Sequence, residues 1–194
     1  MAQKKILCFG DSNTYGYDPR SFLGGRYEAD SRWCDLLSEQ LGCTVLNYGE
    51  NGRALPRHTW EHQVLQETLE ANAPVDLLIL MLGTNDLLMD LEELTATTAG
   101  RLETMLDSVQ AHWPMLPILL LPPLPMGVPL PGLNEKVCAL GLRYAQIAAD
   151  RSLLFCDTTP WHLPLAYDRV HLSPEGHQQL AEQLGIFLKR GRRS

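Results

Sequence analysis

The stretch Ile6-Leu7-Cys8-Phe9, followed at once by Gly10-Asp11-Ser12-Asn13-Thr14-Tyr15-Gly16, decides how this chain folds. Four consecutive apolar residues predict a short buried strand, and the glycines on either side of Ser12 predict a tight turn after it. In open α/β sheets, ligands bind in the crevice outside the carboxyl ends of the strands. Ser12 is therefore expected at the edge of a sheet where chemistry takes place.

Four more aliphatic runs follow, and they are continuous rather than alternating, which is typical of parallel strands covered on both faces. They span residues 44–48, 77–82, 118–121 and 153–156. Helical patterns alternate with the strands, at about 32–41, 60–71, 94–113, 133–151 and 174–189, the last with Ser173 as its N-cap. This alternation predicts an α/β protein, a three-layer α/β/α sandwich with a five-stranded parallel sheet.

Length and composition point to one ordinary globular domain over residues 1–194, with 45% hydrophobic and 20% charged residues. No apolar run approaches the ~18 residues that a membrane span needs, so no membrane partner is expected. The four apolar residues after Lys4 and Lys5 are too few for a secretory signal, which favours a cytoplasmic location.

Charge and cysteine content exclude other classes. The net charge of −7 opposes a nucleic-acid backbone, although basic residues gather at 189–193. The five cysteines are odd in number and lack C-x-x-C spacing, which disfavours a disulfide framework and a zinc site. We therefore expect neither a nucleic-acid partner nor a bound metal.

The chemistry of Ser12 depends on the other end of the chain. Asp168 and His171 lie three residues apart in the run Asp168-Arg169-Val170-His171. A hydroxyl nucleophile needs a base, and the base needs a carboxylate that orients it. The sequence therefore predicts that Ser12 is a nucleophile, His171 its general base and Asp168 the orienting group.

Donors for a developing oxyanion are expected after the second and third strands. Those strands end in Gly49-Glu50-Asn51-Gly52 and Gly83-Thr84-Asn85-Asp86. The backbone N–H groups of Ser12 and Gly52 and the amide of Asn85 would converge at the sheet edge. Gly49 lies three residues before Gly52 and competes with it for this role, although we favour Gly52.

These blocks, taken in order, resemble those of the SGNH hydrolases, also called the GDSL esterase/lipase family. The resemblance covers the whole chain and is closest to the arylesterase and acyltransferase branch. It implies a flavodoxin-like sheet of order 2-1-3-4-5, a Ser12–His171–Asp168 triad and an oxyanion hole of Ser12, Gly52 and Asn85. The family usually has leucine where this chain has Asn13, which leaves the shape of the pocket beside the nucleophile open.

The resemblance implies a serine esterase that acts on a small-molecule ester through an acyl-enzyme, without metal or organic cofactor. The natural ester stays open, with a thioester or an acetylated carbohydrate as alternatives. Hydrolysis and acyl transfer to another alcohol both fit this chemistry. Whether the protein forms a homo-oligomer is equally open.

Three other interpretations of the sequence compete with this one. His58-Thr59-Trp60-Glu61-His62 matches an H-x-x-E-H zinc motif, but such a short motif matches often by accident. A phosphatase acting through Asp11 would need a second aspartate where Asn13 stands. A flavodoxin-like module that binds phosphate or FMN would leave Asn85, Asp168 and His171 without a role.

Two further expectations concern the surroundings of the site. The apolar, proline-rich loop 122–131 follows the fourth strand at the edge that also carries Ser12, and it could form a wall of the substrate pocket. In that case, substitutions of Leu124 or Met126 would change substrate preference and leave the fold largely intact. His177 is expected on the surface of the last helix.

Overall fold

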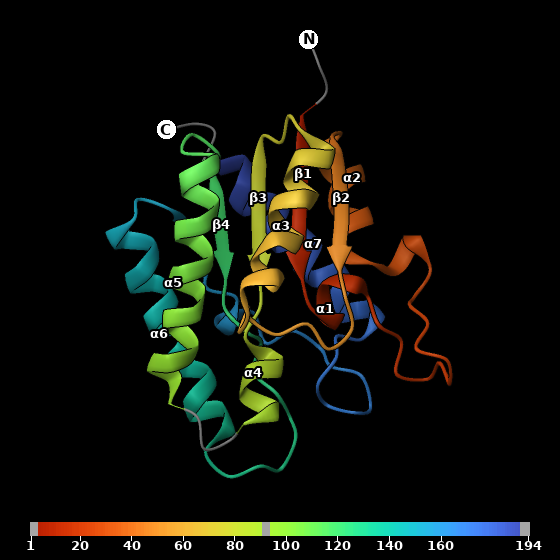
Figure 1. Ribbon diagram of the computed structural model, residues 1–194. Coiled ribbons are helices and arrows are strands. Elements are labelled where there is room, and N and C mark those ends of the chain that lie inside the picture. Colours follow the sequence, from red (N-terminus) through yellow and green to blue (C-terminus); the bar gives the residue numbers. More distant parts are fainter. Residues whose placement is uncertain (1–3, 91–93, 191–194) are drawn as a thin grey trace.

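The computed structural model describes residues 4–90 and 94–190. Its five strands are β1 (Lys5–Gly10), β2 (Thr44–Gly49), β3 (Leu77–Met81), β4 (Ile118–Leu121) and β5 (Leu154–Phe155). They form one parallel sheet of order β2-β1-β3-β4-β5, in which Gly10 pairs with Gly49 and Met81 at its carboxyl edge. The arrowheads of β2, β3 and β4 in Figure 1 therefore point the same way, toward α1 (Ser12–Tyr15) and α4 (Thr84–Met89).

Helices cover both faces of the sheet. One face carries α3 (Thr59–Asn72), α5 (Thr95–His112) and α6 (Leu133–Asp150), and the other carries α2 (Trp33–Leu41) and α7 (Pro174–Arg190). In the view of Figure 1, α3 lies in front of the sheet and α7 behind it. The layers are those expected from the alternation of strands and helices in the sequence.

The core lies in two clusters, one on each face of the sheet. Leu7 and Phe9 of β1 pack into the cluster with α3, α5 and α6, whereas Ile6 and Cys8 pack into the cluster with α2 and α7. Successive strand residues point to opposite faces, so a strand that is covered on both sides must be apolar at every position. This explains the continuous aliphatic runs in the sequence.

The predicted fold is confirmed, and the main elements begin and end within about two residues of the expected positions. The sequence did not predict α1 or α4, which have only four and six residues. Of the basic run 189–193, only Lys189 and Arg190 belong to the described residues. Among the described helices, none is long and apolar enough to cross a membrane.

Candidate active site

Ser12 is the first residue of α1, directly after β1. The Asp11 carboxylate caps this short helix by accepting a hydrogen bond of 2.9 Å from the Asn13 N–H, and Gly16 ends it in the left-handed region with φ 87°. A Cβ atom at Gly49 would lie 2.0 Å from the Tyr15 nitrogen. The helix therefore sits directly against the end of β2, which fixes the height of Ser12 above the sheet.

His171 joins Ser12 to Asp168 through its imidazole ring. Its Nε2 lies 2.9 Å from the Ser12 Oγ, and its Nδ1 lies 2.5 Å from the Asp168 Oδ2. Because an ionised carboxylate only accepts hydrogen bonds, Nδ1 carries the proton and Nε2 is left to accept from the Ser12 hydroxyl. This is the arrangement in which a serine can lose its proton to the ring.

Asp168 is held in the ionised form that this arrangement needs. Its Oδ1 accepts hydrogen bonds of 3.1 Å from the backbone N–H groups of Val170 and His171. Partial burial alone would raise the pKa of Asp168, but the bonds from the His171 ring and from these two N–H groups outweigh it, so the pKa is lowered. The ring of Tyr17 packs on His171 with 4.6 Å between centroids.

Asn85 occupies the second position of α4, and Gly83 caps that helix with φ 115°. The Asn85 Nδ2 donates a hydrogen bond of 2.8 Å to the backbone oxygen of Arg53. A carboxamide nitrogen carries two hydrogens, so this bond fixes the group and leaves a second donor. Asn85 and the loop of residues 50–55 are thereby joined into one unit.

Gly49 and Gly52 differ in what their backbones do. The Gly49 N–H donates to the Asn47 Oδ1 at 2.9 Å, and Gly49 packs closely against α1. Gly52 lies in the left-handed region with φ 77°, and a Cβ atom there would meet nothing within 4 Å. Of the two glycines, Gly52 thus faces open space, whereas the Gly49 N–H is already bonded.

Arg53 ties the loop of residues 50–55 to β1, and no pattern in the sequence singles it out. Its Nη1 donates to the backbone oxygen of Gly10 at 2.9 Å and also to that of Tyr48. The guanidinium lies 3.9 Å from the centroid of the Phe9 ring. An arginine among hydrophilic loop residues carries no sequence signal for such contacts, because they depend on the packed sheet edge.

Asp86 supports the same loop from α4. It is fully buried, and its Oδ2 accepts a hydrogen bond of 2.9 Å from the Leu55 N–H while Arg101 lies 3.1 Å from its Oδ1. Burial raises the pKa of Asp86 despite these partners. Its place in the Gly83–Asp86 block was the signal that could have drawn attention to it.

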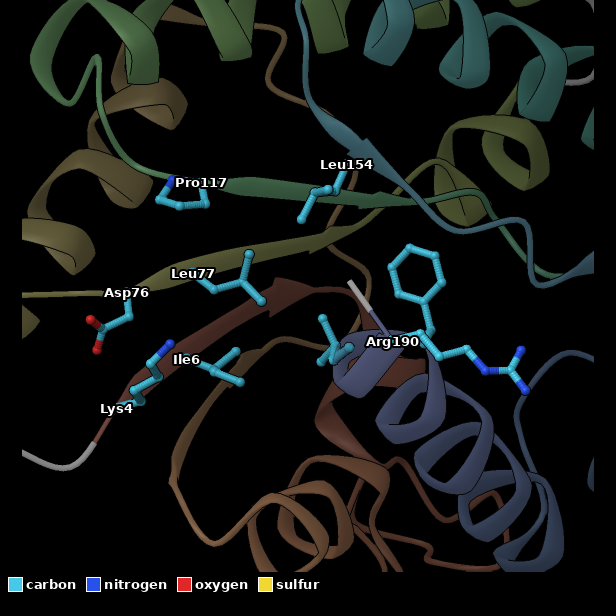
Figure 2. Close-up of a pocket in the computed structure, with 9 residues that line it drawn as sticks. Lys4, Ile6, Asp76, Leu77, Pro117, Leu154 and Arg190 are labelled. Atoms are coloured by element: carbon cyan, nitrogen blue, oxygen red, sulfur yellow. The ribbon is translucent and has the colours of Figure 1, made fainter. Parts of the chain in front are cut away.

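A pocket of about 360 Å³ opens beside Gly52. It is lined by Phe9, Glu50, Asn51, Gly52, Arg53, Ala54, Leu55, Pro56, Arg57, Trp60, Glu61, Val64 and Met89. Trp60 and Met89 are largely exposed and give it an apolar rim. A larger apolar hollow of about 490 Å³ lies at the opposite, amino edge of the sheet, between Leu77, Leu154 and Arg190 (Figure 2).

Within the loop 122–131, the two residues that were expected to line a substrate pocket are buried in the core. Leu124 and Met126 are only 2% and 3% exposed and belong to the two core clusters. Gly127 donates a hydrogen bond of 2.8 Å to the Arg169 carbonyl, so the loop packs behind the turn that carries Asp168. The expectation that Leu124 and Met126 could be replaced with little effect on the fold is therefore wrong.

Two other expectations are resolved by the packing. His177 is buried rather than on the helix surface: its Nδ1 accepts from the Trp33 N–H at 3.4 Å, and desolvation lowers its pKa to about 3. In the H-x-x-E-H run, the Glu61 carboxylate accepts from the backbone N–H groups of Arg57 and His58 and caps α3. Within the described ranges, no group of three or more His, Cys, Asp or Glu residues is placed to hold a metal.

The chain is similar to one protein family and to several solved structures. The GDSL-like lipase/acylhydrolase family profile matches residues 8–179. The M. smegmatis aryl esterase has a TM-score of 0.83 and 25% identity, over 96% of this chain and 99% of that one. A carbohydrate acetylesterase family member from Sinorhizobium meliloti has a TM-score of 0.82 and 27% identity, over 96% and 98%. No curated protein sequence matches the chain at a significant level.

Proposed function

Because the chain belongs to the GDSL-like lipase/acylhydrolase family and is an ester hydrolase, we propose that Ser12, His171 and Asp168 carry out its reaction as a catalytic triad. The observation that carries this proposal is the line of hydrogen bonds from Ser12 Oγ to His171 Nε2 and from His171 Nδ1 to Asp168 Oδ2. It supplies nucleophile, base and orienting carboxylate in the order that acyl transfer needs.

The reaction begins with attack of the Ser12 Oγ on the ester carbonyl carbon. His171 accepts the serine proton as the new C–O bond forms, and the carbonyl oxygen takes the electron pair. When the tetrahedral intermediate collapses, the bond to the leaving alcohol breaks and His171 donates the proton to that alcohol. Water, or another alcohol, then attacks the acyl-enzyme in the same way and releases the acyl group.

The oxyanion of the intermediate is assigned to three donors: the backbone N–H groups of Ser12 and Gly52 and the side-chain amide of Asn85. Gly52 is favoured over Gly49 because the Gly49 N–H is bonded to Asn47. The bond from Asn85 to the Arg53 carbonyl holds the amide in place before substrate binds. Donors fixed in advance stabilise the developing charge without reorganising during the reaction.

For the substrate, we propose a small carboxylic ester that binds across Ser12 into the pocket beside Gly52. The apolar rim of Trp60, Val64 and Met89 supports an uncharged group on the substrate. An aryl ester and an acetylated carbohydrate are both in keeping with the names of the two similar structures. A thioester requires the same chemistry and is the remaining alternative.

The experiment that tests this function is a panel of activated esters of increasing acyl length, together with an acetylated sugar and an acyl-CoA. A burst of one leaving group per enzyme molecule, followed by slower turnover, is expected from an acyl-enzyme. Trapping of the acyl group on Ser12, located by peptide mass spectrometry, would identify the nucleophile. Acylation at another residue would overturn the assignment.

A further inference from the structure

The residue after the nucleophile makes an unusual pair of contacts. Asn13 is 1% exposed, and its carboxamide bonds to the peptide groups on either side of His171. The Asn13 Oδ1 accepts a hydrogen bond of 2.8 Å from the Leu172 N–H, and its Nδ2 donates one of 3.4 Å to the Val170 carbonyl. The side chain thus pairs with this backbone much as a neighbouring strand would.

The backbone of Asn13 is itself held in place by two hydrogen bonds. The Asn13 N–H donates to the Asp11 carboxylate at 2.9 Å, and the Asn13 carbonyl accepts from the indole Nε1 of Trp33 at 3.0 Å. Trp33 is fully buried in the cluster between α2 and α7. The carboxamide is therefore held from the core side before it reaches the backbone around His171.

The backbone around His171 belongs to no helix or strand. It is held by bonds such as that from the Ala166 N–H to the His171 carbonyl, at 2.7 Å, and by an isolated bridge between Leu165 and Leu172. Those contacts stay within the loop and do not set its distance from α1. The two Asn13 bonds reach the loop from α1 itself, across 157 and 159 positions of the chain, and the Tyr17 ring packs on His171 just beyond the end of that helix.

From this arrangement we propose that Asn13 is a positioning residue, which holds the His171 backbone so that Nε2 stays within hydrogen-bond distance of the Ser12 Oγ. The proposal rests on the function proposed above, in which His171 is the general base. It also answers the question raised by the sequence, since Asn13 points toward residues 170–172 and is not among the residues that line the pocket beside Gly52. A misplacement of about 1 Å between reacting groups can cost about 10²-fold in rate.

Leucine is the matched replacement, because it has the same branched shape as asparagine and neither a donor nor an acceptor. Asn13→Leu is expected to lower kcat by about 10–10²-fold while KM changes by less than about threefold. Asn13→Asp keeps an acceptor for the Leu172 N–H in either protonation state. Its kcat should lie between those of Asn13→Leu and the wild type, and it serves as the second variant if Asn13→Leu folds poorly.

Asn72 provides the control for a purely structural effect. Its carboxamide also makes two hydrogen bonds, to the Tyr48 hydroxyl at 2.7 Å and to the Thr68 carbonyl at 2.8 Å, far along α3 from Ser12. Asn72→Leu should lower the melting temperature and leave kcat per folded molecule unchanged. If Asn13→Leu behaves in the same way as Asn72→Leu, Asn13 has a structural role only and the proposal is wrong.

The decisive measurement is a double-mutant cycle with His171→Ala. A residue that acts through His171 has nothing to position once the imidazole is gone, so Asn13→Leu should then change the residual rate by less than about twofold. An equal fold-loss in both backgrounds would overturn the proposal. If His171→Ala itself left kcat near the wild-type value, the proposed function would fail instead, and the two failures are thereby distinguished.

Discussion

The two ends of the β-sheet differ in the size of their pockets and in the residues that surround them, and the larger pocket is not at the end with the candidate catalytic residues. The amino edge has the larger hollow, about 490 Å³, in which Figure 2 shows Ile6, Leu77 and Leu154 projecting inward, with Lys4 and Asp76 toward one side. The carboxyl edge has the smaller pocket, about 360 Å³, beside Gly52. All the residues to which we assign chemistry lie at the carboxyl edge.

The reason lies in chain direction. In a parallel sheet every strand ends at the carboxyl edge, and the helix that follows begins there with unpaired backbone N–H groups. Asp11, which caps α1, and Gly83, which caps α4, both occupy this edge. The amino edge receives helix ends, whose carbonyl groups do not stabilise a developing negative charge. The orientation of the backbone therefore decides where an ester can be cleaved.

The largest expected effect comes from removing the nucleophile at the carboxyl edge. Ser12→Ala deletes a single hydroxyl from a residue whose backbone is fixed by α1, so kcat should fall by about 10³-fold or more with little change in melting temperature. Steady-state kinetics and thermal unfolding of the same preparation check this. A variant that keeps more than about a hundredth of the wild-type kcat would remove Ser12 from the mechanism.

Asn85→Ala is expected to have the next largest effect. Its amide would meet full negative charge only in the transition state, so kcat should fall by about 10²–10³-fold while KM moves only a few-fold. The same change removes the bond to the Arg53 carbonyl, which should cost about 1 kcal/mol of stability. Lower stability with normal kcat per folded molecule would show that Asn85 only fixes the loop.

The third prediction concerns Asp11, whose burial at the carboxyl edge should lower the free energy of unfolding at neutral pH. Burial raises its pKa from 3.8 to about 6, so between these pH values the folded state keeps a proton that the unfolded chain has released. Its contribution therefore lowers the free energy of unfolding as pH rises from about 4 to 6, by about 3 kcal/mol in total. Asp11→Asn keeps an oxygen that can cap α1 and removes this titration.

Urea unfolding of the wild type and Asp11→Asn at pH values from 4 to 8 measures the difference. The stability of the variant relative to the wild type should increase as pH rises from 4 to 6 and stay constant above about 7. A difference that does not change with pH would mean that the Asp11 carboxyl ionises in the folded protein as it does in water.

The smallest expected effect comes from substituting one apolar residue in each of the two hollows. Met89 and Leu154 are exposed apolar residues, one in each hollow. Met89→Gln should change KM for apolar esters by a few-fold, whereas Leu154→Gln should leave both kcat and KM unchanged. If Leu154→Gln changed substrate preference, the amino edge would take part in the reaction, and the assignment of all chemistry to the carboxyl edge would be wrong.

Sequence patterns predicted the framework well because strands and long helices are encoded locally. The aliphatic run of β3 and the Ser173-Pro174 start of α7 each carry their own signal. Ser12 and His171 could also be singled out from the sequence, because each lies in a short block at a strand end or in a loop. In the structure the Ser12 Oγ lies 2.9 Å from the His171 Nε2.

What could not be predicted depends on contacts between distant segments. The burial of Leu124 follows from packing of its loop into the core beside α7, and no local pattern distinguishes that from an exposed wall. His177 is buried where α7 packs against α2, and its ring accepts a hydrogen bond from the backbone N–H of Trp33, 144 positions earlier. The contacts of Asn13 with Val170 and Leu172 are likewise invisible until the two ends of the chain are packed together.

The separation of 159 positions between Ser12 and His171 has a consequence for synthesis of the protein. A nascent chain on the ribosome acquires Ser12 before strands β2 to β5 are made, but it lacks His171 until all five strands have been made. Every truncated product that ends before residue 171 should therefore be unable to cleave an ester by this mechanism. Esterase activity could serve as a reporter of full-length folding, and two fragments divided at the exposed Met115 should regain activity only on reassembly.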